Sequence, residues 1–215
     1  MIKAIIFDLD NCLSAADEPG RELLAPVFHA IQRHHHGQFS AEALAEIRFD
    51  CWRHPLDWIA RKHRFSAELQ AAAWAAYESL EVRVPMRGYP DLGVLSELAV
   101  LRFLVTSGFR RMQESKIRAL GIASHFTAIH IDALGDANRV GKEGIFRNIL
   151  SQYRLPTAEV LVVGDNPDSE LEAGNRLGIV TVQILRPEVP RGHNATHIIH
   201  GLAELKALIR DLGNG

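Results

Sequence analysis

The sequence has little cysteine, little net charge and no long apolar run, and each shortage excludes a class of protein. Two cysteines among 215 residues do not suggest a disulfide framework, so we expect free thiols in a reducing compartment. A formal net charge of −2 without long runs of one sign indicates neither a nucleic-acid nor a membrane partner. No apolar run approaches the roughly 18 residues that cross a bilayer, and no leader pattern is present. We therefore expect a cytoplasmic protein that binds small molecules or proteins.

What the chain does have is apolar residues, 47% of the total, in two different arrangements. Residues 14–84 repeat them at helical spacing and predict a small helical module. From residue 85 onward strand and helix signals alternate, which favours a parallel sheet covered by helices. A first strand over 3–8 belongs to the same sheet, so the helical module is an insertion. The predicted strands of the second part are 101–105, 126–131, 160–163 and 179–185, and its predicted helices are 91–99, 110–120, 142–153, 168–177 and 202–212.

Polar residues follow three of the predicted strands, and a lysine begins one of the helices. In parallel sheets, ligands bind beyond the carboxyl ends of the strands where strand order reverses, so these residues are the ones to examine. Hydroxyl, ammonium and backbone amide groups near helix starts suit a phosphoryl group, and clustered carboxylates suit Mg²⁺. The set consists of Asp8, Asp10, Thr106, Ser107, Gly108, Lys142 and the stretch from Gly164 to Glu170.

Asp8 and Asp10 stand two residues apart at the end of the first predicted strand. In an extended chain, residues i and i+2 point to the same side, so we expect the two carboxylates to share a common volume. Like charges repel there unless a divalent cation lies between them or one carboxyl keeps a proton as a general acid. Taken alone, the pair is also compatible with a strand end that begins a turn.

Four short motifs in a fixed order resemble those of the haloacid dehalogenase-like hydrolase superfamily, and the match covers the whole chain. The helical insertion after the first motif is similar to the family's first type of cap. The resemblance implies an α/β fold, with a Rossmann-like parallel-sheet core over 1–13 and 85–215 and a small all-α cap over 14–84. The motifs are Phe7-Asp8-Leu9-Asp10, Leu104-Val105-Thr106-Ser107-Gly108, Gly141-Lys142-Glu143, and Val163-Gly164-Asp165 through Glu170.

The resemblance also implies catalytic roles. Asp8 would be the nucleophile that forms an aspartyl-phosphate, and Asp10 would protonate the leaving oxygen and later deprotonate the attacking water. Thr106 would donate a hydrogen bond to the phosphoryl group with nearby backbone amides, and Lys142 would offset negative charge. Substrate binding is accordingly expected at Thr106, Ser107, Gly108 and Lys142.

A Mg²⁺ ion is the cofactor that the resemblance implies. It would be held by the Asp8 side chain, the Asp10 backbone carbonyl and Asp165, with waters completing an octahedron. Glu170 takes the place of a second acidic residue, commonly Asp in the family, and is expected in a supporting role. A further departure is Cys12 in place of the commoner Thr, which removes a hydroxyl and adds an oxidisable thiol.

Each of these residues has a simpler interpretation. Thr106 could be a helix cap, Lys142 a solvated first-turn lysine, and Glu170 a plain surface charge. Asp165 could cap the following helix, although Asn166 before Pro167 already has that pattern.

Three consecutive histidines, His34 to His36, suggest a metal site at first sight. Neighbouring residues on a helix are turned by about 100° from one another, so three in a row cannot converge on one ion without unwinding. A solvated helix end is therefore expected instead of a zinc site.

The function predicted from these motifs is Mg²⁺-dependent hydrolysis of a small phosphorylated metabolite. A sugar-phosphate mutase shares both aspartates, and a non-catalytic binding protein on the same fold is a further alternative. Dehalogenation is disfavoured because that branch lacks the acid/base aspartate and the metal. Phosphonate cleavage would require a Schiff-base lysine, for which Lys62 is the only lysine between 14 and 90. The middle of the predicted cap is modestly basic, which could favour a second anionic group on the substrate, and a solvent-exposed face explains the same residues equally well. These residues are Arg48, Arg53, His54, Arg61 and Lys62.

Overall fold

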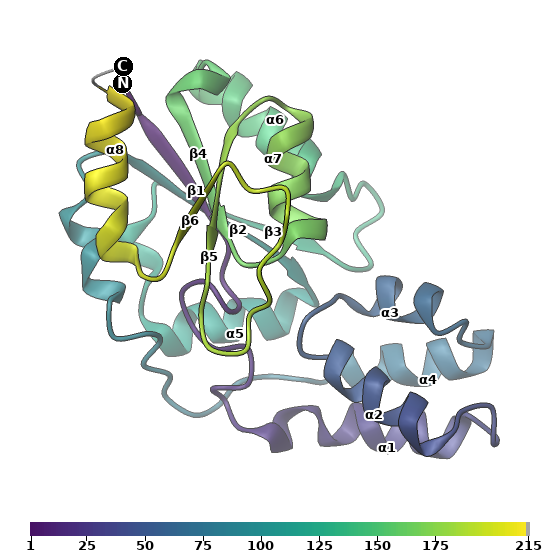
Figure 1. Ribbon diagram of the computed structural model, residues 1–215. Helices are drawn as coiled ribbons and strands as arrows, with labels where there is room; N and C mark the ends of the chain where they lie inside the picture. Colours follow the sequence, from purple (N-terminus) through teal and green to yellow (C-terminus); the bar gives the residue numbers. More distant parts are fainter. Residues whose placement is uncertain (214–215) are drawn as a thin grey trace.

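A six-stranded parallel sheet, covered by helices on both faces, forms the larger part of the computed structural model, which describes residues 1–213 (Figure 1). The strand order is β3-β2-β1-β4-β5-β6. Strand order therefore reverses between β1 and β4, which is where parallel sheets bind ligands. The strands are β1 (Ala4–Phe7), β2 (Leu101–Gly108), β3 (Ala128–Ala133), β4 (Val160–Gly164), β5 (Val180–Ile184) and β6 (His197–Ile199).

Apolar side chains pack on both faces of the sheet, one cluster on each face. Ile5 and Phe7 pack toward α5 (Arg110–Leu120) and α8 (Leu205–Gly213). Ala4 and Ile6 pack toward α6 (Gly141–Tyr153) and α7 (Glu172–Arg176). All four residues of β1 are buried, as expected for an apolar run in the middle of a parallel sheet. The predicted α/β fold with a Rossmann-like core is confirmed.

Four helices form a second group beside the sheet, with an apolar core of their own (Figure 1). They are α1 (Ala25–His34), α2 (Ala41–Asp50), α3 (Leu56–Lys62) and α4 (Ala67–Glu78). The hydroxyls of Ser40 and Ser66 cap α2 and α4, accepting hydrogen bonds from Ala43 N and Leu69 N. Phe109 and Met112 of the sheet domain pack into this core, so the two groups are joined by apolar contact.

The boundaries of the insertion at residues 14 and 84 remain a prediction, and the last two residues of the predicted core range lie outside the described residues. Three other element predictions need correction. Residues 91–99 make only a 3-10 helix at Leu92–Glu97, and 168–177 starts with a π-turn at Pro167–Leu171 before α7. Strand β6 was not predicted, because a strand of three residues is too short to show a period. Within residues 1–213, no helix has the length and apolar character needed to cross a membrane.

Candidate active site

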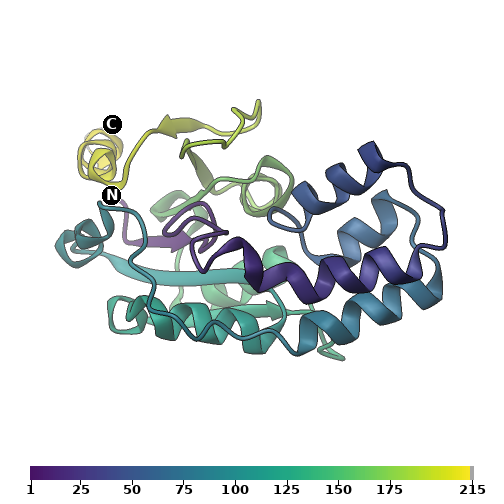
Figure 2. The ribbon, with the colours of Figure 1, turned by 90° about the horizontal axis from the view of Figure 1, so that it is seen from below.

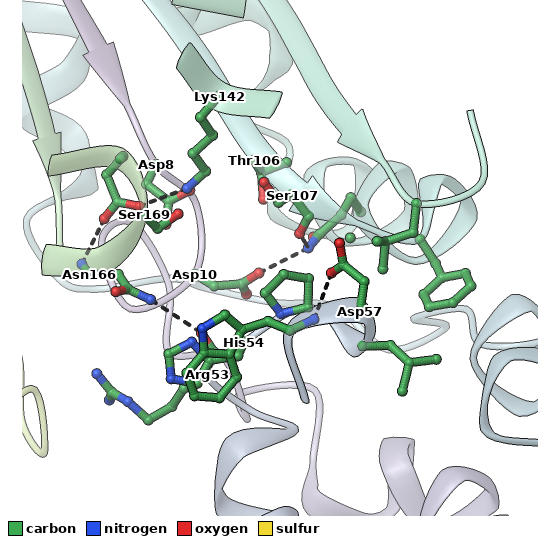
Figure 3. A pocket seen from close by; sticks show the side chains of 18 of the residues that line it. Asp8, Asp10, Arg53, His54, Asp57, Thr106, Ser107, Lys142, Asn166 and Ser169 are labelled. Atoms are coloured by element: carbon green, nitrogen blue, oxygen red, sulfur yellow. Dashed lines mark hydrogen bonds and ion pairs between the residues drawn. The ribbon is translucent and has the colours of Figure 1, made fainter. Parts of the chain in front are cut away.

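The predicted motifs meet at one edge of the sheet. Phe7 pairs with Leu104 of β2 and with Val163 of β4, so the residues that follow these three strands emerge side by side. A cavity of about 180 Å³ lies there, between the sheet edge and α3 (Figure 3). Every residue predicted for the site lines it, namely Asp8, Asp10, Thr106, Ser107, Gly108, Lys142, Asp165 and Glu170.

Asp8 and Lys142 form the buried centre of this site. Lys142 Nζ, in the first turn of α6, donates to Asp8 Oδ1 at 2.8 Å and to Glu170 Oε2 at 2.7 Å. Burial raises the pKa of Asp8 to about 7, although the Lys142 ammonium opposes that shift. For Lys142, burial lowers the pKa, but the carboxylates of Asp8 and Glu170 outweigh it and raise the pKa above its usual value. Lys142 is thus not a solvated lysine.

The carboxylates of Asp8, Asp165 and Glu170 lie together, each offering an oxygen within 4.8 Å of the others. All three side chains are buried. Burial raises the pKa of Asp165 well above its usual value, and the charges of Glu170 and Asp8 add to this. Lys142, and Arg53 at 3.5 Å from Asp165 Oδ2, supply two positive charges to three carboxyl groups, so a divalent cation would relieve the remaining repulsion. Hard oxygen donors at this spacing fit Mg²⁺.

Glu170 reaches this cluster because residue 164 is glycine. A Cβ at Gly164 would lie 2.2 Å from Glu170 Oε1, so any larger residue would displace the carboxylate. Asn166 N donates to Glu170 Oε1 at 2.7 Å, and the Asn166 side chain accepts from Asp168 N at 3.0 Å. Asn166 is therefore the cap, as predicted. The interpretation of Glu170 as a surface charge is wrong, since its exposed fraction is 1%.

The Asp10 carboxylate lines the same cavity as Asp8 but has hydrogen-bond partners of its own. Lys116 Nζ donates to Asp10 Oδ1 at 2.6 Å, and Gln113 Nε2 donates to Asp10 Oδ2 at 3.1 Å. The two carboxylates face one cavity even though the chain is not extended as that expectation assumed, since β1 ends at Phe7 and Asn11 takes a left-handed φ of 53°. The sequence does hold a signal for both partners, because they stand three apart on the buried face of the amphipathic helix α5.

Thr106, Ser107 and Gly108 end β2. The side chains of Thr106 and Ser107 face the same cavity as Asp8 (Figure 3). Thr106 is buried, and the Ser107 hydroxyl donates to Asp132 Oδ2 at 3.0 Å. Gly108 has a φ of 146°, and a Cβ there would lie 2.9 Å from Gln113 Nε2. Glycine therefore allows the Gln113 amide to reach both Ser107 O and the Asp10 carboxylate.

Arg139, which sequence reasoning missed, links the sheet domain to the helical group. Its guanidinium donates to Asp132 Oδ1 and Oδ2 at 2.8 and 2.7 Å, and to Asp57 Oδ2 of α3 at 2.5 Å. Asp132 in turn accepts the hydrogen bond from Ser107, so one chain of polar contacts runs from α3 to the end of β2. No local pattern marks Arg139, because Asp57 is 82 residues away in the sequence.

Basic residues of the helical group divide into two sets. Arg53, His54 and Arg61 line the cavity; Arg53 NH2 lies 3.5 Å from Asp165 Oδ2, and the His54 ring stacks on Trp58. Lys62 instead pairs with Glu46 and Asp50, at 2.8 Å from each, outside the cavity lining. Arg48 lies over the Phe28 ring.

Cys12 is part of the loop after β1 and is fully buried. Its thiol faces Val163 O at 3.7 Å, and burial raises its pKa well above the usual value. The thiol therefore stays protonated and shielded from solvent, which disfavours the oxidation that the sequence suggested for Cys12.

A family model described as haloacid dehalogenase-like hydrolase matches residues 2–178, which span all four motifs. The chain belongs to this family. As a haloacid dehalogenase-like hydrolase it is an enzyme, and residues of its four motifs line the cavity at the strand-order reversal of the sheet.

Two archaeal members resemble the chain over most of their length. A glyceraldehyde 3-phosphate phosphatase of Methanopyrus kandleri is 29% identical over 205 residues, covering 86% of this chain and 85% of that protein. One of the same name from Methanocaldococcus jannaschii is 24% identical over 238 residues, covering 99% of both. Among solved structures, a Bacillus subtilis protein of this superfamily bound to magnesium has a TM-score of 0.61 at 17% identity, covering 97% of this chain and 98% of that one.

Proposed function

We propose that this hydrolase is a Mg²⁺-dependent phosphatase that transfers the phosphoryl group of a small phosphomonoester to Asp8 and then to water. The observation that carries the proposal is the buried cluster of Asp8, Asp165 and Glu170 around Lys142 at the strand-order reversal. The names of the two archaeal relatives support the same activity.

In the first step, a carboxylate oxygen of Asp8 forms a bond to phosphorus while the bond from phosphorus to the leaving oxygen breaks. Asp10 gives its proton to that oxygen. In the second step, Asp10 takes a proton from water, the water oxygen bonds to phosphorus, and the bond from phosphorus to Asp8 breaks. Inorganic phosphate leaves, and both aspartates return to their starting states.

The remaining residues bind and orient the phosphoryl group. The Thr106 hydroxyl and the backbone amides of Ser107 and Gly108 donate to its oxygens, and the Lys142 ammonium offsets negative charge on it and on Asp8. Asp8, Asp165 and the Asp10 carbonyl would hold Mg²⁺, and Glu170 would support that set. When bound, the ion supplies positive charge that stabilises the transferring phosphoryl group.

The leaving group is small and polar in this proposal. A cavity of about 180 Å³ suits a substrate of triose-phosphate size, in agreement with the names of the two relatives. Arg53, His54 and Arg61 favour hydroxyl, carbonyl or anionic groups on it. Phosphonate cleavage is disfavoured, because Lys62 is paired with two carboxylates and does not line the cavity. The predicted cytoplasmic location, and the absence of nucleic-acid and membrane partners, stay predictions.

Turnover of a panel of phosphorylated metabolites, with and without Mg²⁺, tests the proposal. We expect Asp8→Asn to lower turnover by about 10⁴-fold or more, as for other catalytic nucleophiles, with the circular dichroism spectrum retained. Asp211→Asn is the matched control, since Asp211 is an exposed acid on α8 that does not line the cavity. Release of inorganic phosphate separates a phosphatase from a mutase, which would isomerise the substrate. Full turnover in Asp8→Asn, or none in the native protein with any phosphoester, would overturn the proposal.

A further inference from the structure

The run of three histidines lies at the end of α1, outside the catalytic cavity. The helix ends at His34, and two residues later His36 takes a left-handed φ of 46°. The chain thus leaves the helix within the run, so the 100° rotation between neighbours no longer separates the side chains. The three histidines do not all converge, as expected, but the end of the helix within the run lets two of them, His34 and His36, come together.

The two converging rings meet one carboxylate, that of Glu68 in the first turn of α4. His34 Nδ1 lies 3.0 Å and His36 Nε2 lies 3.3 Å from the same atom, Glu68 Oε1. The helices α1 and α4 pack antiparallel, which brings the end of one to the start of the other (Figure 2). His35 turns away, with its ring stacked on Phe39.

We propose that His34, His36 and Glu68 bind a divalent transition metal, for which Zn²⁺ is the best fit. Two imidazoles and one carboxylate are a ligand set that zinc uses, and tetrahedral bonds of about 2.0–2.2 Å put ligand atoms about 3.3–3.5 Å apart. The two contacts to Glu68 Oε1 are close to that spacing, and all three ligand atoms lie within 4.8 Å of one another. Solvent reaches the cluster, so water can complete the tetrahedron.

The charges around the cluster also favour a cation. In the part of the chain that the structure describes, Glu68 pairs with these two imidazoles and with no lysine or arginine. The other cluster in the helical group, Glu46, Asp50 and His63, already holds the Lys62 ammonium. A zinc ion at Glu68 would tie the end of α1 to the start of α4 and so stabilise the helical group.

Titration calorimetry with Zn²⁺ on the full chain, in saturating Mg²⁺, tests this site. Mg²⁺ occupies the oxygen ligands of the catalytic cluster but binds imidazoles poorly. Since removing a residue that merely orients a ligand typically costs about 10–100-fold in metal affinity, His36→Ala and Glu68→Gln should each weaken Zn²⁺ binding by at least about tenfold. His35→Ala is the matched control and should bind Zn²⁺ as the native protein does.

A second readout uses Co²⁺ in place of Zn²⁺. The native protein should show the visible absorption of a tetrahedral cobalt site and a higher unfolding temperature with the ion, and both should be lost in Glu68→Gln. The three side chains are at least one-third exposed, so the variants should fold. Absence of Zn²⁺ binding by the native protein, or equal loss in His35→Ala, would overturn the site. Phosphatase activity plays no part in either outcome.

Discussion

At the scale of single residues, the two aspartates of the first motif differ in the lysine that each one contacts. Asp8 and Asp10 are two residues apart, yet Asp8 contacts Lys142 and Asp10 contacts Lys116. One ammonium thus lies against the proposed nucleophile and the other against the proposed acid. Lys116 is 2% exposed, so its charge is directed at Asp10 and little solvent screens it.

We expect Lys116→Met to lower kcat/KM by about 100-fold, because Asp10 would lose the partner that positions it for proton transfer. The loss should be larger for alkyl phosphates than for aryl phosphates, whose leaving oxygens need less protonation. Steady-state kinetics on both substrate types, with exposed Lys206→Met as control, checks this. An equal loss for both types would show that Lys116 acts only on folding.

Gly164→Ala should displace Glu170 and so weaken Mg²⁺ binding. The new Cβ would fall 2.2 Å from Glu170 Oε1, and such overpacking costs about 1–3 kcal/mol of unfolding free energy. Gly93→Ala is the control, because nothing lies within 4 Å of a Cβ at that position. Urea denaturation and Mg²⁺ calorimetry measure the two effects. Unchanged Mg²⁺ affinity in Gly164→Ala would remove Glu170 from the metal set.

At the scale of elements, helix α3 is held over the cavity by the contact between Arg139 and Asp57. Both side chains are about 30% exposed, so solvent screens the pair and its contribution is modest. The same guanidinium is anchored on Asp132 at the end of β3. The proposed cap thus has a polar attachment to the sheet domain as well as an apolar one.

Asp57→Asn should therefore loosen α3 without disturbing the sheet. We expect a loss of about 0.5–1 kcal/mol in unfolding free energy and faster hydrogen exchange confined to the α3 amides. Asp136→Asn breaks the exposed pair with Arg110 and serves as control. If α3 exchange is unchanged in Asp57→Asn, the apolar contacts alone hold the helix.

At the scale of the whole molecule, burial disfavours the ionised forms of Asp8 and Asp165 in the folded chain. A carboxyl whose pKa is higher in the folded than in the unfolded protein takes up a proton on folding. Its contribution to unfolding free energy therefore falls as pH rises from 3.8, the ordinary value, to about 7, the folded value for Asp8. Protein freed of metal should lose stability over this range.

Mg²⁺ should reverse that loss, because it binds the ionised cluster only in the folded chain. The expected gain is about 2.7 kcal/mol at a free concentration one hundred times Kd. Asp165→Asn should be more stable than the native protein without Mg²⁺ and less stable with it. Thermal unfolding of both proteins at pH 5 and pH 7, with EDTA or Mg²⁺, measures this. If Mg²⁺ did not change the unfolding temperature of the native protein, the proposed Mg²⁺ site would be wrong.

Much of the molecule follows from local sequence, and the misses have physical causes. Helices 110–120 and 142–153 were predicted within one residue of α5 and α6, because each has a strong period of 3.6 residues. Short or irregular elements have no such period, so β6 and the π-turn at Pro167 were not predicted. Asp8 and Asp10 line one cavity, but their different partners, Lys142 and Lys116, are far from them in the sequence and could not be predicted from local spacing.

The sequence by itself determined the α/β class, the strand ends that carry polar residues and the identity of the site-lining motifs. Local spacing and residue chemistry are enough for these, because the carboxyl ends of parallel strands must meet at one edge. Only the tertiary structure decided the partners of those residues: Lys116 on Asp10, Arg139 on Asp57, and His34 with His36 on Glu68. These pairs join elements far apart in the chain, and their contact depends on how helices pack, which no local period records.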